Sequence, residues 1–374
     1  MTIHDVARRA RVSITTVSHV INQTRRVEAS TRARVEAAIA ELGYRRNALA
    51  NALASDLRRG RTRTIGLILF DIASPLMTAI ARGAEDVASA AGYGLFLCNT
   101  DQRADKQRAY MEMLLEHQVA GILIGPVEGT SADVARLHGS GVPLVTLGYN
   151  AADLALDGAR LDYAGGARAA SAHLVAHGHR RIAVLLAQGD RRLPVAEQRL
   201  RGHRQALREA GIAPDPGLEV AHEDSRHGAH AAAARLLDSE VPFTAVFSFT
   251  TTSTLGLLVA LRERRRLVPD DVSVVSFGDA DWLAAHDPPI TAVAAPNDQV
   301  GARAAGLLLR RIAEAERLAA GGTPESDRQP GQPGSNGTPV GAPPPLAAGA
   351  RTAPEVALIP TPLIVRRSVA PPRG

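Results

Sequence analysis

Residues 2–22 read TIHDVARRARVSITTVSHVIN, and this stretch decides the fold of the N-terminal part of the chain. Its apolar side chains recur every three or four residues, the period of an amphipathic helix. A first helix, which Thr2 caps, has an apolar face made of Ile3, Val6, Ala7 and Ala10. A second helix, which Ser13 caps, has an apolar face made of Val17, Val20 and Ile21. The stretch therefore predicts two short helices joined by a tight turn.

A third helix follows, and either Ser30 or Thr31 caps it. Its inward side chains are Val35, Ala38, Ile39 and Leu42, and Gly43 ends it. Only Arg11 and Val12 separate the first helix from the cap of the second. Short helices joined so closely are typical of a helix-turn-helix.

The second predicted helix carries a polar stripe opposite its apolar face. The stripe consists of Thr15, Ser18, His19 and Asn22, spaced for one side of a helix. Hydroxyl, imidazole and amide groups can bond to base edges in the major groove, and Ile14 and Thr16 could offer methyl groups to thymine. The flanking arginines would contact phosphates: Arg8, Arg9, Arg25, Arg26, Arg32 and Arg34. The alternative is a small helical bundle with a solvated polar face.

The distribution of charge supports contact with a polyanion. Residues 1–63 hold 13 arginines and five acidic residues, a net charge of +8, whereas the whole chain of 374 residues carries +5. A basic N-terminal segment on a nearly neutral remainder indicates that the segment meets nucleic acid and that the remainder has another task.

From residue 64 to about residue 320, short β-branched runs alternate with Ala-rich amphipathic runs. The strands expected are 65–70, 95–98, 121–124, 144–147, 182–186, 245–249 and 272–277. This alternation is typical of parallel sheets covered by helices on both faces. About ten strands are too many for one small sheet, so we expect two doubly wound lobes with a break near residues 150–162.

Residues 321–354 include 15 Gly or Pro among 34 and few apolar side chains, so we predict a disordered insertion. The chain then returns to a strand-like ALIPTPLIVRRS that we expect to dock on the core. The predicted domains are a helix-turn-helix over 1–46, a hinge helix and linker over 47–63, a two-lobed core over 64–320, the insertion, and a terminal strand and tail over 355–374.

Polar and aromatic side chains follow the predicted core strands, where doubly wound sheets bind ligands. These candidates are Asp71, Ser74, Asn99, Asp101, Tyr149, Phe247, Asp279 and Trp282. Carboxylates hold polyols by paired hydrogen bonds, and an aromatic face stacks on the apolar face of a sugar. Two alternatives stand beside this interpretation: Trp282 as a core anchor and Asp71 as a helix cap.

Longer stretches of this sequence resemble the lactose/galactose-repressor (LacI/GalR) family. They include residues 2–50, RTRTIGLILFDIASP, YMEMLLEHQVAGILI, HLVAHGHRRIAVL, VSVVSFGDADW and DPPITAV, so the resemblance covers nearly everything except 321–354. It implies a DNA-binding head, a hinge helix that docks in the minor groove, and a two-lobed effector core similar to a periplasmic sugar-binding protein.

The resemblance also implies individual DNA contacts. The NALANAL run matches the family hinge, with Asn47, Ala50 and the wedge residue Leu53. Here ASDL intervenes before RRGRTRTIG, so Leu57 is a rival wedge, and His19 stands where the family usually has Arg. The full set expected at DNA is Thr2, Ser13, Ile14, Thr15, Thr16, Ser18, His19, Asn22, Asn47, Ala50, Leu53 and Leu57.

In the core, Arg199 matches the arginine with which the family binds its effector, although a solvated arginine face is the alternative. Thr250 and Thr251 stand where the family typically has Asn-Asp, and Gly278 replaces a common acid. Such a pocket suits a less hydroxylated sugar-related ligand or is vestigial. The full set expected at the effector is Asp71, Ser74, Asp101, Tyr149, Arg199, Phe247, Thr250, Asp279 and Trp282.

Other classes of protein fit poorly. Cys98 is the only cysteine, so neither disulfides nor a Cys-rich zinc site can form. The N-terminus has no signal peptide, and no stretch is apolar enough for a membrane span, so we expect a cytoplasmic protein without membrane contact. His173, His177 and His179 suggest a metal site only at first sight, because no Glu or Cys accompanies them. No catalytic motif occurs, and we expect no enzyme and no cofactor.

These patterns together predict a homodimeric transcriptional repressor. Its heads would read the half-sites of a pseudo-palindromic operator in double-stranded DNA, and a small sugar-like effector in the core would modulate binding. Two other classes are kept as alternatives. One is a sugar-binding-type module whose DNA binding is impaired or vestigial, and the other is an enzyme built on the two-lobed core.

Overall fold

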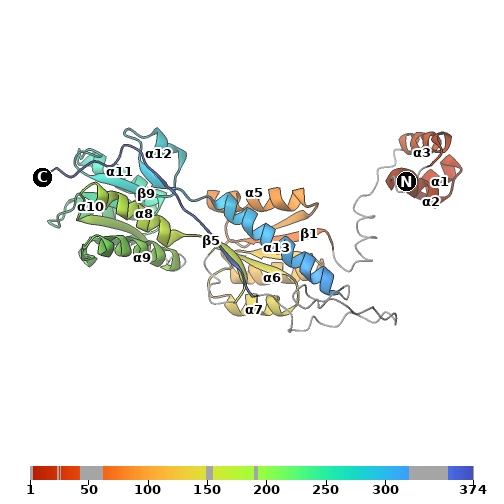
Figure 1. The fold of residues 1–374 in the computed structure, drawn as a ribbon, viewed down its shortest axis with the longest axis horizontal. Helices are drawn as coiled ribbons and strands as arrows, with labels where there is room; N and C mark the ends of the chain where they lie inside the picture. The colour runs from red at the N-terminus through yellow and green to blue at the C-terminus, as the bar shows by residue number, and fades with distance from the viewer. Residues whose placement is uncertain are drawn as a thin grey trace, which may run out of the picture. The chain divides into compact units, whose positions relative to one another are not determined.

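The computed structural model describes residues 3–22, 25, 27–42, 62–148, 155–188, 193–319 and 353–373. The chain forms two compact units, Met1–Thr62 and Arg63–Gly374 (Figure 1). None of the helices within the described ranges is long and apolar enough to cross a membrane. The predicted hinge and linker, apart from residues 62–63, and the predicted insertion, apart from residues 353–354, lie outside the described residues.

The N-terminal unit contains the three predicted helices: α1 (Ile3–Ala10), α2 (Ile14–Asn22) and α3 (Ala29–Glu41). Their shared core centres on Val6, Val17 and Val35, all fully buried. Arg11 takes a left-handed backbone conformation, φ 53°, in the short turn between α1 and α2. The predicted apolar side chains that the structure describes therefore meet as expected, and the side chains of Ile3 and Ile21 lie outside the described part of the chain.

The helix caps are only partly as predicted. The N–H of Thr16 donates to the Ser13 hydroxyl over 3.1 Å, which confirms Ser13 as the cap of α2. The predicted cap of α3 is wrong, because α3 begins one residue before Ser30 and its N-cap residue is Glu28. The Ser30 hydroxyl instead donates to the Glu28 carboxylate over 2.8 Å.

The core unit contains two six-stranded sheets, as the alternation of strands and helices predicts. Lobe 1 has the parallel order β11-β5-β4-β3-β1-β2. Its strands are β1 (Thr64–Leu69), β2 (Gly94–Asn99), β3 (Gly121–Ile124), β4 (Leu144–Leu147), β5 (Asp157–Leu161) and β11 (Val356–Ile359). Its helices are α5 (Pro75–Ala90), α6 (Ala104–Glu116), α7 (Ser131–Gly139) and α13 (Asn297–Ala319).

Lobe 2 has the order β12-β10-β9-β8-β6-β7, parallel except for β12. Its strands are β6 (Ile182–Gln188), β7 (Glu219–Glu223), β8 (Ala245–Ser248), β9 (Ser273–Phe277), β10 (Thr291–Val293) and β12 (Leu363–Ile364). Its helices are α8 (Tyr163–Ala176), α9 (Leu193–Glu209), α10 (Arg226–Leu237), α11 (Thr251–Glu263) and α12 (Asp281–Ala285), and a 3₁₀ turn covers Pro216–Leu218.

Helices cover both faces of each sheet (Figure 1). In lobe 1, α5 and α13 pack on the face that includes Leu67, and α6 and α7 pack on the face that includes Ile68. In lobe 2, α8 and α9 pack on the face of Phe247, and α10 and α11 pack on the face of Val246. Both lobes are therefore doubly wound.

The chain passes between the lobes three times. The passages follow β5, β10 and β11, each at the carboxyl end of the strand. The carboxyl ends of both parallel sheets therefore face the junction of the lobes. This is the edge at which doubly wound sheets bind ligands.

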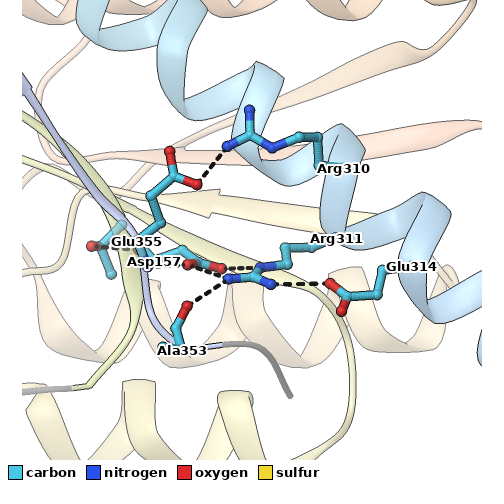
Figure 2. A network of polar contacts seen from close by, with 7 residues as sticks. Asp157, Arg310, Arg311, Glu314, Ala353 and Glu355 are labelled. Atoms are coloured by element: carbon cyan, nitrogen blue, oxygen red, sulfur yellow. Dashed lines mark hydrogen bonds and ion pairs between the residues drawn. The ribbon is translucent and has the colours of Figure 1, made fainter. Parts of the chain in front are cut away.

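The chain returns to lobe 1 after the predicted insertion through a network of ion pairs (Figure 2). Arg311 of α13 donates two hydrogen bonds to the Asp157 carboxylate, over 2.6 and 2.8 Å, and one to the Ala353 carbonyl, over 3.1 Å. Asp157 also accepts from the N–H of Glu355 over 2.7 Å, and Arg310 pairs with the Glu355 carboxylate over 2.7 Å. The network holds β11 against β5.

Replacing Asp157 by Asn should lower the free energy of unfolding by about 2 kcal/mol, because the substitution leaves the largely buried Arg311 without its bidentate partner. Burial acts to raise the pKa of Asp157, but hydrogen bonds from Arg311 and from the Glu355 N–H hold it below its ordinary value. The stabilisation is therefore present above the unfolded pKa, about 3.9, and is lost as pH falls through the folded pKa.

Unfolding by urea at pH values from 7 to 3 measures this difference. Asp270→Asn is the control, because Asp270 is half exposed in its ion pair with Arg373 and such pairs contribute under about 1 kcal/mol. Equal losses in the two variants would contradict a structural role for the Asp157 network.

Candidate functional site

The exposed side of α2 carries the predicted base-reading residues. Thr15 is exposed, Ser18 and His19 are half-buried, and Ile14 is 41% exposed although it is apolar. The hydroxyls of Ser13 and Thr16 lie 2.8 Å apart at the start of the helix. The structure thus brings these residues to one surface, which can donate to and accept from base edges. Asn22 ends α2, and its side chain lies outside the described part of the chain.

The arginines around α2 do not form a uniform group. Arg8 and Arg25 are exposed, and Arg8 lies 3.8 Å from the Asp5 carboxylate. Arg9 donates to the Glu41 carboxylate over 2.7 Å and so ties α1 to α3. Exposed arginines can bind phosphates without reading sequence, whereas Arg9 also has a structural partner.

Several predicted contacts cannot be located. Those that lie outside the described residues are Thr2, Asn47, Ala50, Leu53, Leu57 and Tyr149. The hinge and the choice between Leu53 and Leu57 as its wedge therefore stay predictions.

In lobe 1 the predicted effector residues lie at the carboxyl edge of the neighbouring strands β1 and β2. Asp71 accepts a hydrogen bond from the N–H of Ala73 over 2.9 Å, and Ser74 is the N-cap residue of α5. Asp101 accepts from the Asn99 amide over 2.7 Å and pairs with Lys106. Hydrogen bonds from Lys106 and Asn99 hold the pKa of Asp101 below its ordinary value, and Lys106 balances the charge of this carboxylate.

In lobe 2 Arg199 projects from α9 to the carboxyl edge of β8 and β9. Its Nη1 donates to the Phe249 carbonyl over 2.6 Å. Its Cζ lies 4.1 Å from the ring centroid of Phe277 and 4.9 Å from that of Tyr163. Two aromatic rings and one carbonyl fix the guanidinium at the junction of the lobes, where it can meet a polar ligand.

Asp279 and Thr250 also lie at this edge, but both have partners within the protein. Arg366 donates to the two carboxylate oxygens of Asp279 over 2.7 and 2.8 Å, and also to the Ile290 carbonyl. Thr250 is the N-cap residue of α11, and its hydroxyl accepts from the N–H of Ser253 over 3.0 Å. A ligand at Asp279 would share this carboxylate with Arg366.

The structure argues against Phe247 as an effector contact. Phe247 lies in the middle of β8, in register with Val184 and Val275, and its side chain is fully buried. The sequence places it near the strand end, but the alternation of side chains along the strand points it into the core under α8 and α9.

Trp282 is partly buried against the core of lobe 2, which favours its interpretation as a core anchor.

Sequence reasoning missed several residues at this edge. Tyr163 and Phe277 hold Arg199, Arg366 pairs with Asp279, and Glu223 ends the unpredicted strand β7. Tyr163 begins α8 two residues after β5, a strand that the sequence pattern did not predict, so the sequence carried no signal for it. No pattern in the sequence connects Arg366 to Asp279, which lies 87 residues earlier in the chain.

Two histidines of HLVAHGH contact each other, and the third contacts Thr244. The rings of His173 and His177 lie 4.4 Å apart, and His179 bonds to the Thr244 hydroxyl over 2.8 Å. Burial lowers the pKa of both His173 and His179. Within the described ranges, no group of three or more His, Cys, Asp or Glu side chains could hold a metal ion.

Two family patterns match this chain. Residues 2–47 match "Bacterial regulatory proteins, lacI family", and residues 171–326 match "Periplasmic binding protein-like domain". The HTH-type transcriptional repressor PurR of Vibrio atlanticus (strain LGP32) is 34% identical over 83% of this chain and 92% of its own. The ribose operon repressor of Escherichia coli (strain K12) is 33% identical over 84% of this chain and 93% of its own.

Solved structures show the same architecture. The transcriptional regulator CelR in complex with cellobiose is 28% identical, with a TM-score of 0.65, over 98% of this chain and 99% of its own. The Lac repressor dimer bound to operator and the anti-inducer ONPF has a TM-score of 0.75, over 99% of each chain. At 24% identity, the second likeness is one of fold.

Proposed function

The chain belongs to the lacI family of bacterial regulatory proteins. From this premise we propose that it is a homodimeric repressor of transcription. A small sugar would control it, either by releasing the repressor from its operator or by strengthening its binding to the operator. It would act in the cytoplasm, on double-stranded DNA of pseudo-palindromic sequence. The observation that carries the proposal is the α2 surface, where the polar stripe with Thr15 and His19 lies opposite a fully buried Val17. The relatives are repressors, which supports a regulator rather than an enzyme.

Exposed apolar side chains of the core unit support a dimer. Phe96 and Leu97, on the edge strand β2, are 46% and 40% exposed, and Leu255 and Val259 are exposed on α11. An uncovered edge strand with apolar side chains favours association with another chain. A symmetric dimer would carry two heads and so match a two-fold symmetric operator.

The effector class follows from the polar groups at the junction and from the relatives. One relative is a ribose operon repressor, and a structural neighbour holds cellobiose. In this chain Asp71, Ser74, Thr250 and Arg199 offer hydrogen bonds at the junction of the lobes. A sugar bound there would change operator affinity only through its different affinity for two arrangements of the lobes.

Selection of bound sequences from a random duplex pool, at near-physiological salt, tests the proposed function. Enrichment of one two-fold symmetric site is expected, and that site then serves as the probe for screening sugars such as D-ribose and cellobiose. If no sequence is enriched while a sugar still binds the core, the chain is a ligand-binding module with impaired DNA binding.

Arg199→Ala should abolish the response to the sugar that binds, and operator affinity should change less than twofold. The reason is that Arg199 lies at the junction of the lobes, in the unit that does not carry the head. Fluorescence anisotropy of the labelled operator, with and without sugar, measures both quantities. Arg201→Ala, an exposed arginine on the same helix, is the control. Loss of operator affinity in Arg199→Ala would instead indicate a structural role.

A further inference from the structure

On one face of the lobe 2 sheet, the buried side chains change from apolar to polar at the carboxyl end of the strands. Along the face that α10 and α11 cover, Val246 and Val274 belong to the apolar core. The next residues on the same face of these strands are Ser248 and Ser276, which are in register and fully buried. Ser253 and Thr254 of α11 are fully buried as well, and His222 of β7 is 5% exposed. A buried polar layer therefore lies directly behind Thr250 and the loop of Asp279.

Two chains of hydrogen bonds run through this layer. In the first, the Thr254 hydroxyl lies 3.0 Å from the Thr250 carbonyl and 2.8 Å from the Ser276 hydroxyl, and Ser276 donates to the Gly278 carbonyl over 3.2 Å. This chain fixes the backbone immediately before Asp279. The second chain joins Thr250, Ser253 and His222, and its direction decides what Thr250 can offer to a ligand.

The direction of the second chain follows from His222. The Nδ1 atom of His222 lies 2.7 Å from the Glu223 carbonyl, which can only accept, so Nδ1 carries the proton. In a neutral imidazole Nε2 then accepts, and Ser253 Oγ, 2.8 Å away, must donate to it. Ser253 has no second proton, so the Thr250 hydroxyl, at 2.7 Å, donates to Ser253.

We propose that His222 and Ser253 are positioning residues that fix the hydrogen-bond polarity of Thr250 at the effector site. Thr250 Oγ1 gives its proton to Ser253 and accepts from the Ser253 N–H, which leaves one lone pair. Thr250 therefore presents an acceptor only. The effector group at this position is a hydrogen-bond donor, such as a sugar hydroxyl or an amide N–H, and a carboxylate or phosphate oxygen is disfavoured. This inference rests on the proposed function for its ligand.

The same lobe contains a second buried serine–histidine pair that serves as a comparison. Ser171 of α8 and His203 Nδ1 of α9 lie 2.8 Å apart, and both side chains are buried. This pair joins two helices and has no link to Thr250 among the described hydrogen bonds. Removing the hydroxyl of Ser171 is therefore a control. It shows the general effect of losing a buried hydroxyl that is not bonded to Thr250.

The test is nuclear magnetic resonance of the histidine ring nitrogens in the full-length, ligand-free protein. In the wild type, Nδ1 of His222 is expected to carry a proton and Nε2 to accept a hydrogen bond. Ser253→Ala should shift the Nε2 resonance of His222 to that of a nitrogen without this hydrogen bond and leave His203 unchanged. Ser171→Ala should change His203 and leave His222 unchanged.

Thr250→Val removes the first donor of the chain but leaves the serine–histidine bond, so His222 should keep its tautomer. A proton on Nε2 of His222 in the wild type, or a charged ring, would reverse the chain and overturn the inference. A His222 resonance that does not respond to Ser253→Ala in a folded protein would also overturn it. Failure of sugars to bind would contradict the proposed function alone, because these resonances are recorded without ligand.

Discussion

Replacing Gly301 by Val should destabilise lobe 1 by about 3 kcal/mol, the upper end of the usual range when a tightly packed contact is overfilled. Gly301 lies on α13 where this helix crosses α5. A Cβ atom at this position would lie 1.9 Å from the Ile80 carbonyl oxygen and 2.9 Å from the Ala84 nitrogen. Both atoms belong to the α5 backbone and cannot turn aside as a side chain could. The two helices would have to separate, and the apolar contacts between them would be lost.

The same helix supplies the control. At Gly306, five residues further along α13, an added Cβ would meet nothing within 4 Å. Gly306→Ala should therefore be neutral or stabilise the protein by about 0.5–1 kcal/mol, through the higher helix propensity of alanine. Thermal and urea unfolding of the two variants give the comparison. If Gly301→Val unfolded at the wild-type midpoint, the close crossing of α5 and α13 would be contradicted.

Close crossings of this kind recur in the core and could not be predicted from the sequence. Gly83 of α5 faces the Asp298 carbonyl, Gly202 of α9 faces the Ala164 carbonyl, and Gly256 of α11 faces the His230 nitrogen. Each glycine lies inside a helix, where the sequence alone suggests only a small loss of helix stability. A glycine is required there because the backbone of another helix lies against it. The periodicity of the sequence does not show which helix that is.

The strands also fall into two groups, those that the sequence pattern predicts and those that it does not. All seven strands expected from β-branched runs are present, with ends within two residues, because a buried parallel strand needs a continuous apolar run. The strands that were missed are β5, β7 and β10. The β5 sequence, DGARL, has little apolar character, and it pairs with β11 across about 200 residues of chain and is held by Asp157 and Arg311. Such a strand depends on tertiary contacts.

The positions of strand ends in the sequence predict some features of the candidate site but not others. As the rule for the ends of parallel strands predicts, Asp71 and Asp101 lie at the carboxyl edge of the lobe 1 sheet and Asp279 lies at that of the lobe 2 sheet, and their role as effector contacts stays a prediction. The rule cannot tell which of them are already paired. Lys106 and Arg366 engage two of these three carboxylates, and Arg366 comes from the far end of the chain. A ligand therefore meets an edge with less free charge than the sequence indicates.

The second large effect concerns DNA recognition. Replacing Thr15, Ser18 and His19 together by Ala should weaken binding to the selected operator about 10³-fold, since each base contact contributes about 1–3 kcal/mol. These residues lie on the side of α2 away from the buried Val17 and Val20, so the helical core stays intact. Affinity for unrelated DNA should change little, because the exposed arginines Arg8 and Arg25 are kept.

Titrations of operator and of scrambled duplex, each at two salt concentrations, separate the contribution of base contacts from that of phosphate contacts. The salt dependence should be the same in the variant and the wild type, because counterion release depends on phosphate contacts. Ala37→Ser, on the exposed side of α3, is the control and should bind operator like the wild type. An equal loss on both duplexes would mean that the stripe contributes general affinity rather than base reading. Retention of operator affinity would show that α2 does not read the operator, and the selected sequence would then have to be recognised by residues outside this helix.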